Sequence, residues 1–238
     1  MSKGTRTRQT GGPSRGSGIS DLIAQRLSIY LRCVEDLARA EVRTVSSQTL
    51  ADRFQLNSAQ IRKDLATFGE FGVRGVGYVV GDLKDHLTRI LGLDRDRKVA
   101  IIGAGNLGMA LADYDGFNKE GFSIVALFDN DRSKIGAASK GGVPVYDVRS
   151  LPDVARREKV SIAVLAIPAA AAQAVLDQVV RAGIRAVLNF APTRLKTKPG
   201  LTVKAVDLKI QLENLVFHLA RNEGTLPQAL RGRRSESV

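Results

Sequence analysis

The chain has 238 residues, 44% of them apolar, which is enough for one large domain or two small ones. No apolar run approaches the roughly 18 residues of a membrane span, and the basic N-terminus lacks the apolar segment of a secretory signal, so we expect a cytoplasmic protein. Lysine and arginine number 36 against 24 aspartates and glutamates, and the net charge of +12 favours nucleic acid as a partner, although a merely soluble basic protein would share it.

The first 93 residues divide into a polar arm and a helical region. Residues 1–17 are rich in Gly, Ser, Thr and Arg without apolar periodicity, so we expect a disordered arm that adds non-specific DNA affinity. Cys33 is the only cysteine, which excludes an internal disulfide, and it lies in a helical pattern that predicts a buried thiol. This pattern predicts a first long helix. Its apolar residues at helical spacing are Ile19, Leu22, Ile23, Leu27, Tyr30, Leu31, Val34 and Leu37.

Two short helices are expected next. Ser46 and Ser47 are natural caps for a second helix that ends near Phe54. Asn57 is the expected cap of a third helix, and with Gln60 three residues later it resembles a capping box. The two helices are separated by so few residues that they predict a helix-turn-helix.

A glycine-rich hairpin and a fourth helix complete this region. Two β-prone pieces around glycines in residues 72–80 predict the hairpin, and the fourth helix spans residues 83–91 before a charged linker at 94–98. Three helices followed by a hairpin predict a winged helix-turn-helix domain over residues 18–93.

The third helix has one apolar face and one basic face. Ile61, Leu65 and Phe68 should pack inward, whereas Arg62 and Lys63 lie opposite them, flanked by alanines. Small alanines let a helix approach a DNA groove while the cations reach phosphates or guanine edges. A solvated basic face is the alternative, yet the neighbouring hairpin carries an arginine between glycines that could enter a minor groove. The DNA-binding candidates are Ser58, Gln60, Arg62, Lys63 and Arg74.

From Lys98 onward, short apolar runs alternate with helical segments, which predicts a parallel sheet with helices on both faces. We expect a Rossmann-type domain over residues 98–206, a C-terminal helix over 207–221 and a disordered tail over 222–238. The predicted strands are residues 99–102, 123–128, 162–167, 186–188 and 203–206. The predicted helices are residues 107–114, 169–182 and 208–219.

The first of these strands leads directly into Gly103-Ala104-Gly105-Asn106-Leu107-Gly108 and then a helix, which is the context that a dinucleotide fingerprint requires. Gly103 permits a tight turn, Gly105 lets the backbone approach the pyrophosphate, and Gly108 allows the helix to pack closely on the strand. The phosphates would be held by free N–H groups at the start of the helix.

Asp129 follows the second strand, 129 − 103 = 26 positions after the first glycine of the motif. Its carboxylate could accept hydrogen bonds from the adenosine ribose and would repel a 2′-phosphate, so NADH or NAD is favoured over its phosphorylated form. A carboxylate that merely caps the following turn is the alternative, and Asp131 is a competing acid.

Other cofactor-binding candidates lie after later strands, because ligands of such sheets sit beyond the carboxyl ends of the strands. Phe190 could pack near a nicotinamide or belong to the core. The further candidates are Ile135 after the second strand, Ala166-Ile167-Pro168 after the third, and Asn189 with Phe190 after the fourth.

These motifs together resemble the Rex family of bacterial redox-sensing repressors, over most of the chain from Ile19 to Leu219. The most specific stretches are Ser58-Ala59-Gln60-Ile61-Arg62-Lys63-Asp64-Leu65, Phe68-Gly69-x-Phe71-Gly72-x-Arg74-Gly75-x-Gly77-Tyr78, Gly105-Asn106-Leu107-Gly108-x-Ala110-Leu111, Leu188-Asn189-Phe190-Ala191-Pro192 and Val206-Asp207-Leu208. The resemblance implies a homodimer whose C-terminal helices are swapped, which binds a palindromic operator and releases it when NADH binds, with NAD⁺ competing.

Three residue roles follow from the resemblance alone. Arg26 matches an arginine that contacts Asp207 of the partner subunit, and Tyr114 matches a tyrosine near the nicotinamide. The chain departs from the family at Asp115, where the family usually has proline, and at Ser28-Ile29, where the family often has Leu-Pro.

Two other classes of protein share part of the pattern. A dehydrogenase needs a general acid or base at the nicotinamide, but the chain has only His86 and His218 as histidines, so we expect no enzyme and no catalytic residue. One cysteine and two distant histidines do not form a metal site of known spacing, so no metal is expected. A CoA-binding module is the third alternative, against which Asp129 argues because the CoA ribose carries a phosphate.

Overall fold

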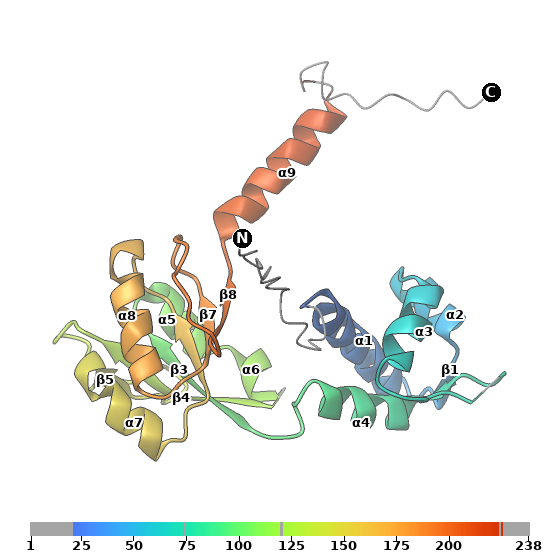
Figure 1. Ribbon diagram of the computed structural model, residues 1–238, viewed down its shortest axis with the longest axis horizontal. Coiled ribbons are helices and arrows are strands. Elements are labelled where there is room, and N and C mark those ends of the chain that lie inside the picture. The colour runs from blue at the N-terminus through green and yellow to red at the C-terminus, as the bar shows by residue number, and fades with distance from the viewer. Residues whose placement is uncertain (1–20, 74, 120, 224, 226–238) are drawn as a thin grey trace, which may run out of the picture. The chain divides into compact units, whose positions relative to one another are not determined.

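The computed structural model describes residues 21–73, 75–119, 121–223 and 225, and it divides into two compact units, Met1–Asp94 and Arg95–Val238 (Figure 1). We describe each unit by itself. The predicted basic arm, Arg74 and the tail from residue 226 onward lie outside the described residues. No helix of the described residues is long and apolar enough to cross a membrane.

The first unit contains helices and one small antiparallel sheet. Strands β1 and β2 pair Thr44 with Val79 and Val45 with Tyr78. Strand β1, which lies before the helix-turn-helix, was not predicted. The elements in chain order are α1 (Asp21–Arg39), β1 (Thr44–Val45), α2 (Ser47–Phe54), α3 (Ser58–Ala66), β2 (Tyr78–Val79) and α4 (Val80–Ile90).

Ser46 and Asn57 form predicted helix caps, whereas Ser47, also predicted as a cap, is the first residue of α2. The Ser46 hydroxyl accepts from the Thr49 N–H at 2.9 Å, and the Asn57 carboxamide oxygen accepts from the Gln60 N–H at 2.9 Å. The capping box predicted for α3 is wrong in one respect. A complete box would have the Gln60 side chain accept from the Asn57 N–H. Instead the Gln60 carboxamide N–H donates forward to the Asp64 carboxylate at 2.6 Å, a strong charge-assisted hydrogen bond.

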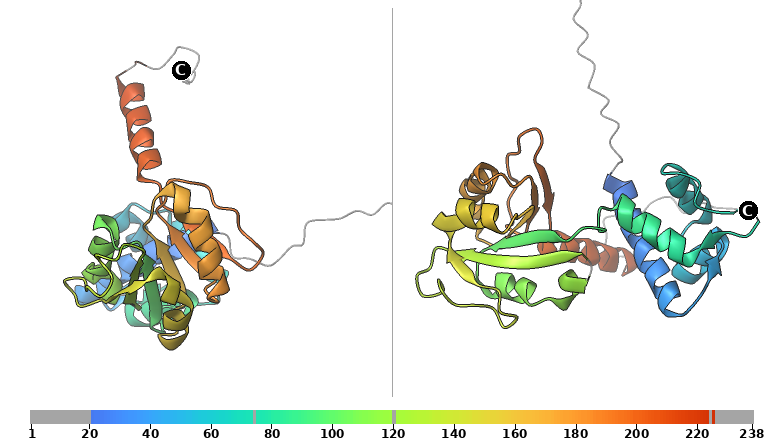
Figure 2. Two further views of the ribbon diagram at one scale, coloured as in Figure 1. Left: turned by 90° about the vertical axis from the view of Figure 1, so that its left-hand side faces the viewer. Right: turned by 90° about the horizontal axis from the view of Figure 1, so that it is seen from below.

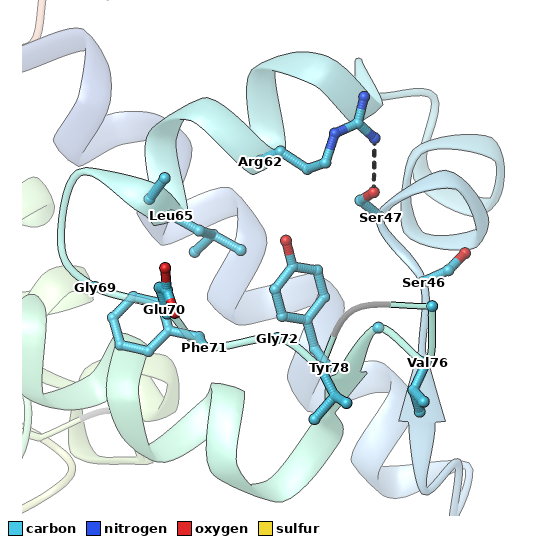
Figure 3. Close-up of a pocket in the computed structure, with 14 residues that line it drawn as sticks. Ser46, Ser47, Arg62, Leu65, Gly69, Glu70, Phe71, Gly72, Val76 and Tyr78 are labelled. Carbon is cyan, nitrogen blue, oxygen red and sulfur yellow. Dashed lines mark hydrogen bonds between the residues drawn. The ribbon is translucent and has the colours of Figure 1, made fainter.

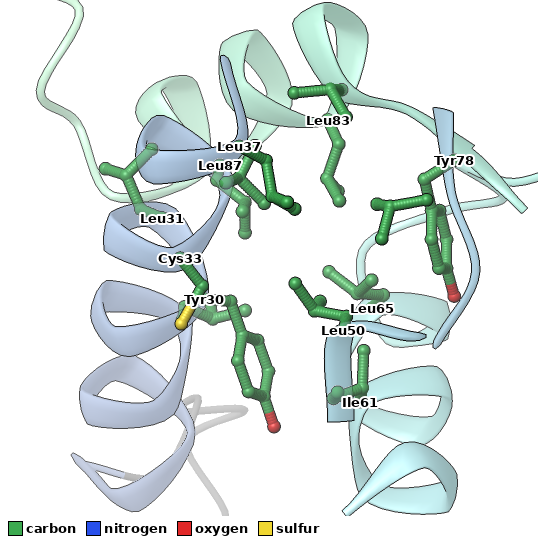
Figure 4. Packing of buried hydrophobic residues seen from close by; sticks show 14 of the residues in the cluster. Tyr30, Leu31, Cys33, Leu37, Leu50, Ile61, Leu65, Tyr78, Leu83 and Leu87 are labelled. Atoms are coloured by element: carbon green, nitrogen blue, oxygen red, sulfur yellow. The ribbon is translucent and has the colours of Figure 1, made fainter. Parts of the chain in front are cut away.

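The hydrophobic core of the first unit lies between α1 and the other helices (Figure 4). Leu27, Leu37, Leu50, Ile61 and Leu87 are almost completely buried, and they come from all four helices. The predicted burial of the cysteine thiol is confirmed, and burial raises the pKa of Cys33. The core therefore orients α3 with its apolar residues inward, as its sequence pattern predicts.

The predicted hairpin is present in a minimal form. Val73 and Gly77 exchange backbone hydrogen bonds of 2.8 and 2.9 Å around a tight loop. Gly77 has φ +102, and a Cβ there would lie 2.5 Å from the Val45 carbonyl oxygen, so only glycine fits between the loop and β1. The loop thus continues the small sheet beside α3.

The second unit is a six-stranded parallel sheet in the order β5-β4-β3-β6-β7-β8. This is the order of a doubly wound dinucleotide-binding fold, with its switch point between β3 and β6. Its strands are β3 (Arg97–Ile102), β4 (Phe122–Asp129), β5 (Val145–Asp147), β6 (Ile162–Leu165), β7 (Ala186–Asn189) and β8 (Thr202–Ala205); its helices are α5 (Asn106–Ala112), α6 (Asp115–Lys119), the 3₁₀ helix η1 (Val148–Ser150), α7 (Leu151–Arg157), α8 (Ala169–Arg181) and α9 (Leu208–Asn222).

Helices cover both faces of this sheet (Figures 1 and 2). On one face, Leu151, Val154 and Leu176 of α7 and α8 pack in the same buried cluster as Phe128 and Leu165 of the strands. On the other face, α5 and α6 contribute residues to a second cluster around β3 and β4. Both faces of β3 and β4 are therefore buried, in keeping with their continuous apolar sequences.

Four short elements of this unit, α6, β5, η1 and α7, were not predicted, and one boundary was wrong. Strand β5 has three residues and α7 has seven, which is too short for a period to stand out between polar and glycine-rich segments. The helix predicted for residues 107–114 ends at Ala112, and a separate helix, α6, begins at Asp115.

Candidate functional site

A cavity of about 600 Å³ opens at the carboxyl ends of β3, β4 and β6 in the second unit. It lies at the switch point of strand order, where open parallel sheets bind ligands. Its lining residues are Ile102, Gly103, Gly105, Phe128, Asp129, Asn130, Asp131, Lys134, Val148, Ala166, Ile167, Pro168, Ala171, Val175 and Gln178. The floor is thus made of backbone and apolar side chains, and the charged groups come from the segment after β4.

The glycines of the loop after β3 are required at two positions by the protein itself. Gly103 has φ +108, and a Cβ there would lie 2.3 Å from the Ala166 carbonyl oxygen. A Cβ on Gly108 would lie 1.8 Å from the Gly103 carbonyl oxygen, so α5 starts in direct contact with the loop. No atom lies within 4 Å of a Cβ built on Gly105, which faces the cavity. The protein does not need a glycine there, but a ligand close to the backbone would.

The Asp129 carboxylate joins the glycine-rich loop to the segment after β4. One oxygen accepts from the Ala104 N–H at 2.9 Å and the other from the Asp131 N–H at 2.9 Å, while the Lys134 ammonium lies 3.2 Å away. Burial opposes ionisation of Asp129, but these two N–H groups and the ammonium outweigh it and hold its pKa below the ordinary value. Asp129 therefore caps the turn that follows it, which was the alternative to a ligand-binding role. Its ionised carboxylate also lines the cavity.

Six of the predicted cofactor-binding residues line this cavity, namely Gly103, Gly105, Asp129, Ala166, Ile167 and Pro168. Ala104, Asn106, Leu107, Gly108, Ile135, Tyr114, Asn189 and Phe190 do not line it. Asn189 is 1% exposed, and its carboxamide holds the turn after β7 through Ala191 and Thr193. Phe190 packs against the cluster around β3 and β4.

Three lining residues that sequence reasoning missed lie on one face of α8. Ala171, Val175 and Gln178 are spaced by four and three positions, so they face the cavity together. Their spacing could have identified this face, because α8 itself was predicted. Val148 could not have been found in this way, since it lies in the unpredicted segment after β5.

The predicted DNA-binding side chains gather on the outer face of α3 in the first unit. Arg62 and Lys63 are exposed, as are Ala59 and Ala66, whereas Ile61 and Leu65 are buried. Ser58 and Gln60 are half-buried near the start of the helix. The face is thus a row of cations on small residues, as its sequence predicts.

A second cavity, of about 670 Å³, lies in the first unit between α3 and the glycines that follow it, Gly69, Gly72, Gly75 and Gly77 (Figure 3). The Arg62 guanidinium donates to the Ser47 hydroxyl at 2.8 Å across its rim, so α2 and α3 are joined at the exposed face. The ring of Tyr78 and the glycines of the loop line the cavity. Ser47 was predicted only as a cap, and its contact with Arg62 has no signal in the sequence.

Helix α9 exposes an apolar face. Leu208, Leu212, Leu215, Val216 and Leu219 are between 58% and 63% exposed and recur at helical spacing. None of the residues of α9 is buried. An uncovered apolar stripe of this length marks an interaction surface.

Comparison with known proteins decides the family. Residues 18–66 match the family model described as "Putative DNA-binding protein N-terminus", and residues 94–193 match the CoA binding domain model. The redox-sensing transcriptional repressor Rex of Carboxydothermus hydrogenoformans is 46% identical over 208 residues, which cover 87% of this chain and 100% of that protein. The Rex repressor of Streptomyces coelicolor is 44% identical over 211 residues, covering 89% of this chain and 81% of that protein.

The chain belongs to the Rex family. Its fold agrees with crystal structures of RSP, a Rex-family repressor. The complex of RSP with β-NAD⁺ and operator DNA has a TM-score of 0.85 at 37% identity and covers 92% of this chain and 100% of that one. The complex of RSP with β-NADH has a TM-score of 0.77 at 38% identity and covers 86% of this chain and 96% of that one.

Two of the positions carried over from the Rex family have intrachain partners in this structure. Arg26 is bound to Asp64 of α3, with distances of 2.5 and 2.8 Å. Asp207 is the N-cap of α9 and accepts from the N–H groups of Lys209 and Ile210. The predicted contact between Arg26 and Asp207 of the partner subunit stays a prediction.

Tyr114, the third position carried over from the Rex family, stands at the end of α5. Its side chain is 58% exposed and meets Phe117 edge to face at 5.1 Å. A Cβ on Gly116 would lie 2.3 Å from the Tyr114 ring, so the glycine after Asp115 makes room for the tyrosine. Asp115 opens α6, a first helical position where the usual family proline is also favoured, so the departure preserves this helix start.

Proposed function

We propose that this chain is a redox-sensing transcriptional repressor that binds palindromic operator DNA through α3 and releases it when NADH fills the cavity of the second unit. Its membership of the Rex family and the two sites within one chain support this proposal. Two features of one chain carry it together. Arg62 and Lys63 are exposed on a helix whose opposite face is buried, and a glycine-lined cavity lies at the switch point of a parallel sheet.

The ligand assignment rests on the charge and polarity of the cavity. Asp129 is an ionised acid at the end of β4, which favours a free ribose over one that bears a 2′-phosphate. The same acid disfavours CoA, although residues 94–193 match a CoA-binding model. RSP, with which this chain shares its fold, forms complexes with β-NADH and with β-NAD⁺.

The switch needs a difference in affinity between two states. Reduced nicotinamide is neutral, whereas the oxidised ring carries a positive charge that is costly to bury among apolar groups. Apolar side chains that include Phe128, Val148 and Val175 line the cavity. We therefore propose that NADH stabilises the form of the repressor that does not bind operator, and that NAD⁺ competes for the site without doing so.

The proposed homodimer explains two apolar features of the second unit. The stripe of α9 is exposed, and an apolar hollow is lined by the buried or half-buried side chains of Val99, Phe117, Phe122, Ile124, Ile162, Val164 and Leu188. Exchange of α9 between two copies would cover such surfaces, and a two-fold axis would present two α3 helices to a palindrome.

We propose that the protein does not catalyse hydride transfer. The His86 ring stacks on Phe71 in the first unit at 4.6 Å, and His218 lies on α9 beside Phe217. Neither histidine lines the nucleotide cavity. The curated relatives named above are repressors, which agrees with a regulatory use of the nucleotide.

A gel shift on a palindromic promoter fragment tests the proposal. NADH should release the fragment at a concentration at which NAD⁺ and NADPH do not. NAD⁺ added first should raise the NADH concentration that is needed. Equal release by all nucleotides, or none by NADH, would contradict the proposed function.

A further inference from the structure

Asp64 is a buried carboxylate on the very helix that we expect to bind DNA. It is 2% exposed, and within the described part of the chain Ser139 and Asn189 are the other buried polar residues. Its neighbours Arg62 and Lys63 are exposed. An acidic side chain beside a DNA surface needs an explanation, because its charge opposes binding of phosphates.

Four donors saturate this carboxylate. Arg26 of α1 donates through Nε at 2.5 Å and through Nη2 at 2.8 Å, and the Tyr30 hydroxyl of the same helix donates at 3.0 Å. The fourth donor is the Gln60 carboxamide, at 2.6 Å, one turn before Asp64. The two oxygens are thus fixed from α1 and from α3 itself, with the paired geometry that arginine gives to a carboxylate.

These contacts favour the ionised carboxylate and the neutral phenol. Hydrogen bonding from Arg26 is the largest cause that lowers the pKa of Asp64, and it outweighs burial. Burial, and then the hydrogen bond to Asp64, raise the pKa of Tyr30 to about 12. The cluster therefore keeps its charges and its geometry over the whole physiological pH range.

The cluster fixes the rotation of α3. Successive helical residues point about 100° apart, so a side chain held inward determines where the residues before it point. With Asp64 tied to α1, Lys63 and Arg62 are turned out to solvent. The two directional hydrogen bonds from arginine add geometric specificity to the apolar packing of Ile61 and Leu65.

We infer that Asp64 is a positioning residue for operator binding: held by Arg26 and Tyr30 of α1, it fixes the orientation in which α3 presents Arg62 and Lys63 to DNA. The inference rests on the proposed function, since it takes α3 as the helix that binds the operator. It assigns Asp64 no contact with DNA.

The variant Asp64→Asn tests this inference because electrostatics and positioning predict opposite signs. Removal of one negative charge should by itself strengthen DNA binding slightly. Loss of the cluster should instead weaken operator binding at least tenfold, because a carboxamide places donors against the donors of Arg26 and Tyr30. The measurement is operator affinity at a temperature at which circular dichroism shows the variant folded, with NADH affinity expected within twofold of the parent chain.

Matched variants separate positioning from general effects. Asp52→Asn removes an exposed carboxylate of α2 whose partner is Gln48, so it should show the charge effect alone, an operator affinity equal to or slightly above that of the parent chain. Arg26→Lys keeps the charge but loses the two-pronged contact, and Tyr30→Phe removes one hydrogen bond. Both variants should weaken operator binding, but by less than Asp64→Asn does. If Asp64→Asn does not fold, Arg26→Lys and Tyr30→Phe test the inference in its place.

Two outcomes distinguish failure of the inference from failure of the proposed function. If folded Asp64→Asn, or the two substitute variants, bind operator as tightly as the parent chain while Lys63→Ala does not bind, the positioning role is overturned. If Lys63→Ala also binds normally, α3 does not bind the operator and the proposed function itself fails.

Discussion

The Asp129 carboxylate both stabilises the fold and lines the candidate nucleotide cavity. It holds the Ala104 N–H of the glycine-rich loop and the N–H of Asp131, and it lines the cavity. Its position after a strand was evident in the sequence, whereas its bond to the loop, 25 residues away, depends on how β3 and β4 pair.

Replacement of Asp129 by alanine should lower NADH affinity about tenfold to a hundredfold, the usual effect of removing a charged hydrogen-bonding group. It should also reduce the preference for NADH over NADPH, because the repulsion of a 2′-phosphate is gone. Calorimetric titration with both nucleotides measures this. Asp131→Ala, an exposed acid nearby, is the control and should have a smaller effect. Unchanged NADH affinity in Asp129→Ala would remove this residue from the site.

The glycines after β3 give a second prediction at the scale of single residues. Gly103→Ala cannot be accommodated, because its Cβ would meet the Ala166 carbonyl oxygen, so both NADH binding and thermal stability should fall. Gly105→Ala fits the protein, so it should keep its melting temperature but bind NADH more weakly, since its Cβ takes space beside the cavity.

The control for both glycine variants is Gly81→Ala, on the open surface of α4. It should change neither NADH affinity nor operator affinity. An unaltered NADH affinity in Gly105→Ala would show that the ligand does not approach the loop as proposed.

Contacts between single residues were the least predictable feature from the sequence. The Gln60 and Asn57 spacing indicated a capping box, but the Gln60 side chain turns forward and donates to the Asp64 carboxylate instead of accepting from the Asn57 N–H. The Arg26–Asp64 pair joins residues 38 positions apart, and such pairing follows only from the packing of α1 on α3. Gly103 and Gly105, which line the cavity, were found because they belong to a short motif that directly follows a strand.

At the scale of elements, long segments with one clear period were predicted and short ones were not. Helices α1, α8 and α9 and strands β3 and β4 lie close to their expected ranges. Strand β5 and helix α7 were missed, because three and seven residues carry too little pattern. The strand β1 was missed for the same reason, since it has only two residues and pairs across the helix-turn-helix.

We predict that the exposed apolar stripe of α9 forms the dimer interface. The double variant Leu212→Asp, Val216→Asp places two charges on its exposed apolar stripe. We expect a monomer in light scattering, and operator affinity reduced more than tenfold because a monomer meets one half-site. Glu213→Gln, on the same helix and paired only with Lys209, is the control that should remain dimeric. A dimer formed by the double variant would exclude the stripe as the interface.

At the scale of the whole molecule, regulation by NADH depends on both units, because neither unit alone holds both proposed sites. The helix proposed to bind operator and the cavity proposed to bind NADH lie in different compact units of one chain. Regulation requires that each ligand favours a different state of the dimer, and the coupling free energy between two ligands is the same in both directions.

The most direct test is therefore the affinity for NADH with and without saturating operator DNA, measured by calorimetry on the intact chain. The account predicts that operator weakens NADH binding by the same factor by which NADH weakens operator binding, and that NAD⁺ binding changes far less. Equal NADH affinity in the presence and absence of operator would contradict the account, because the two sites would then be independent.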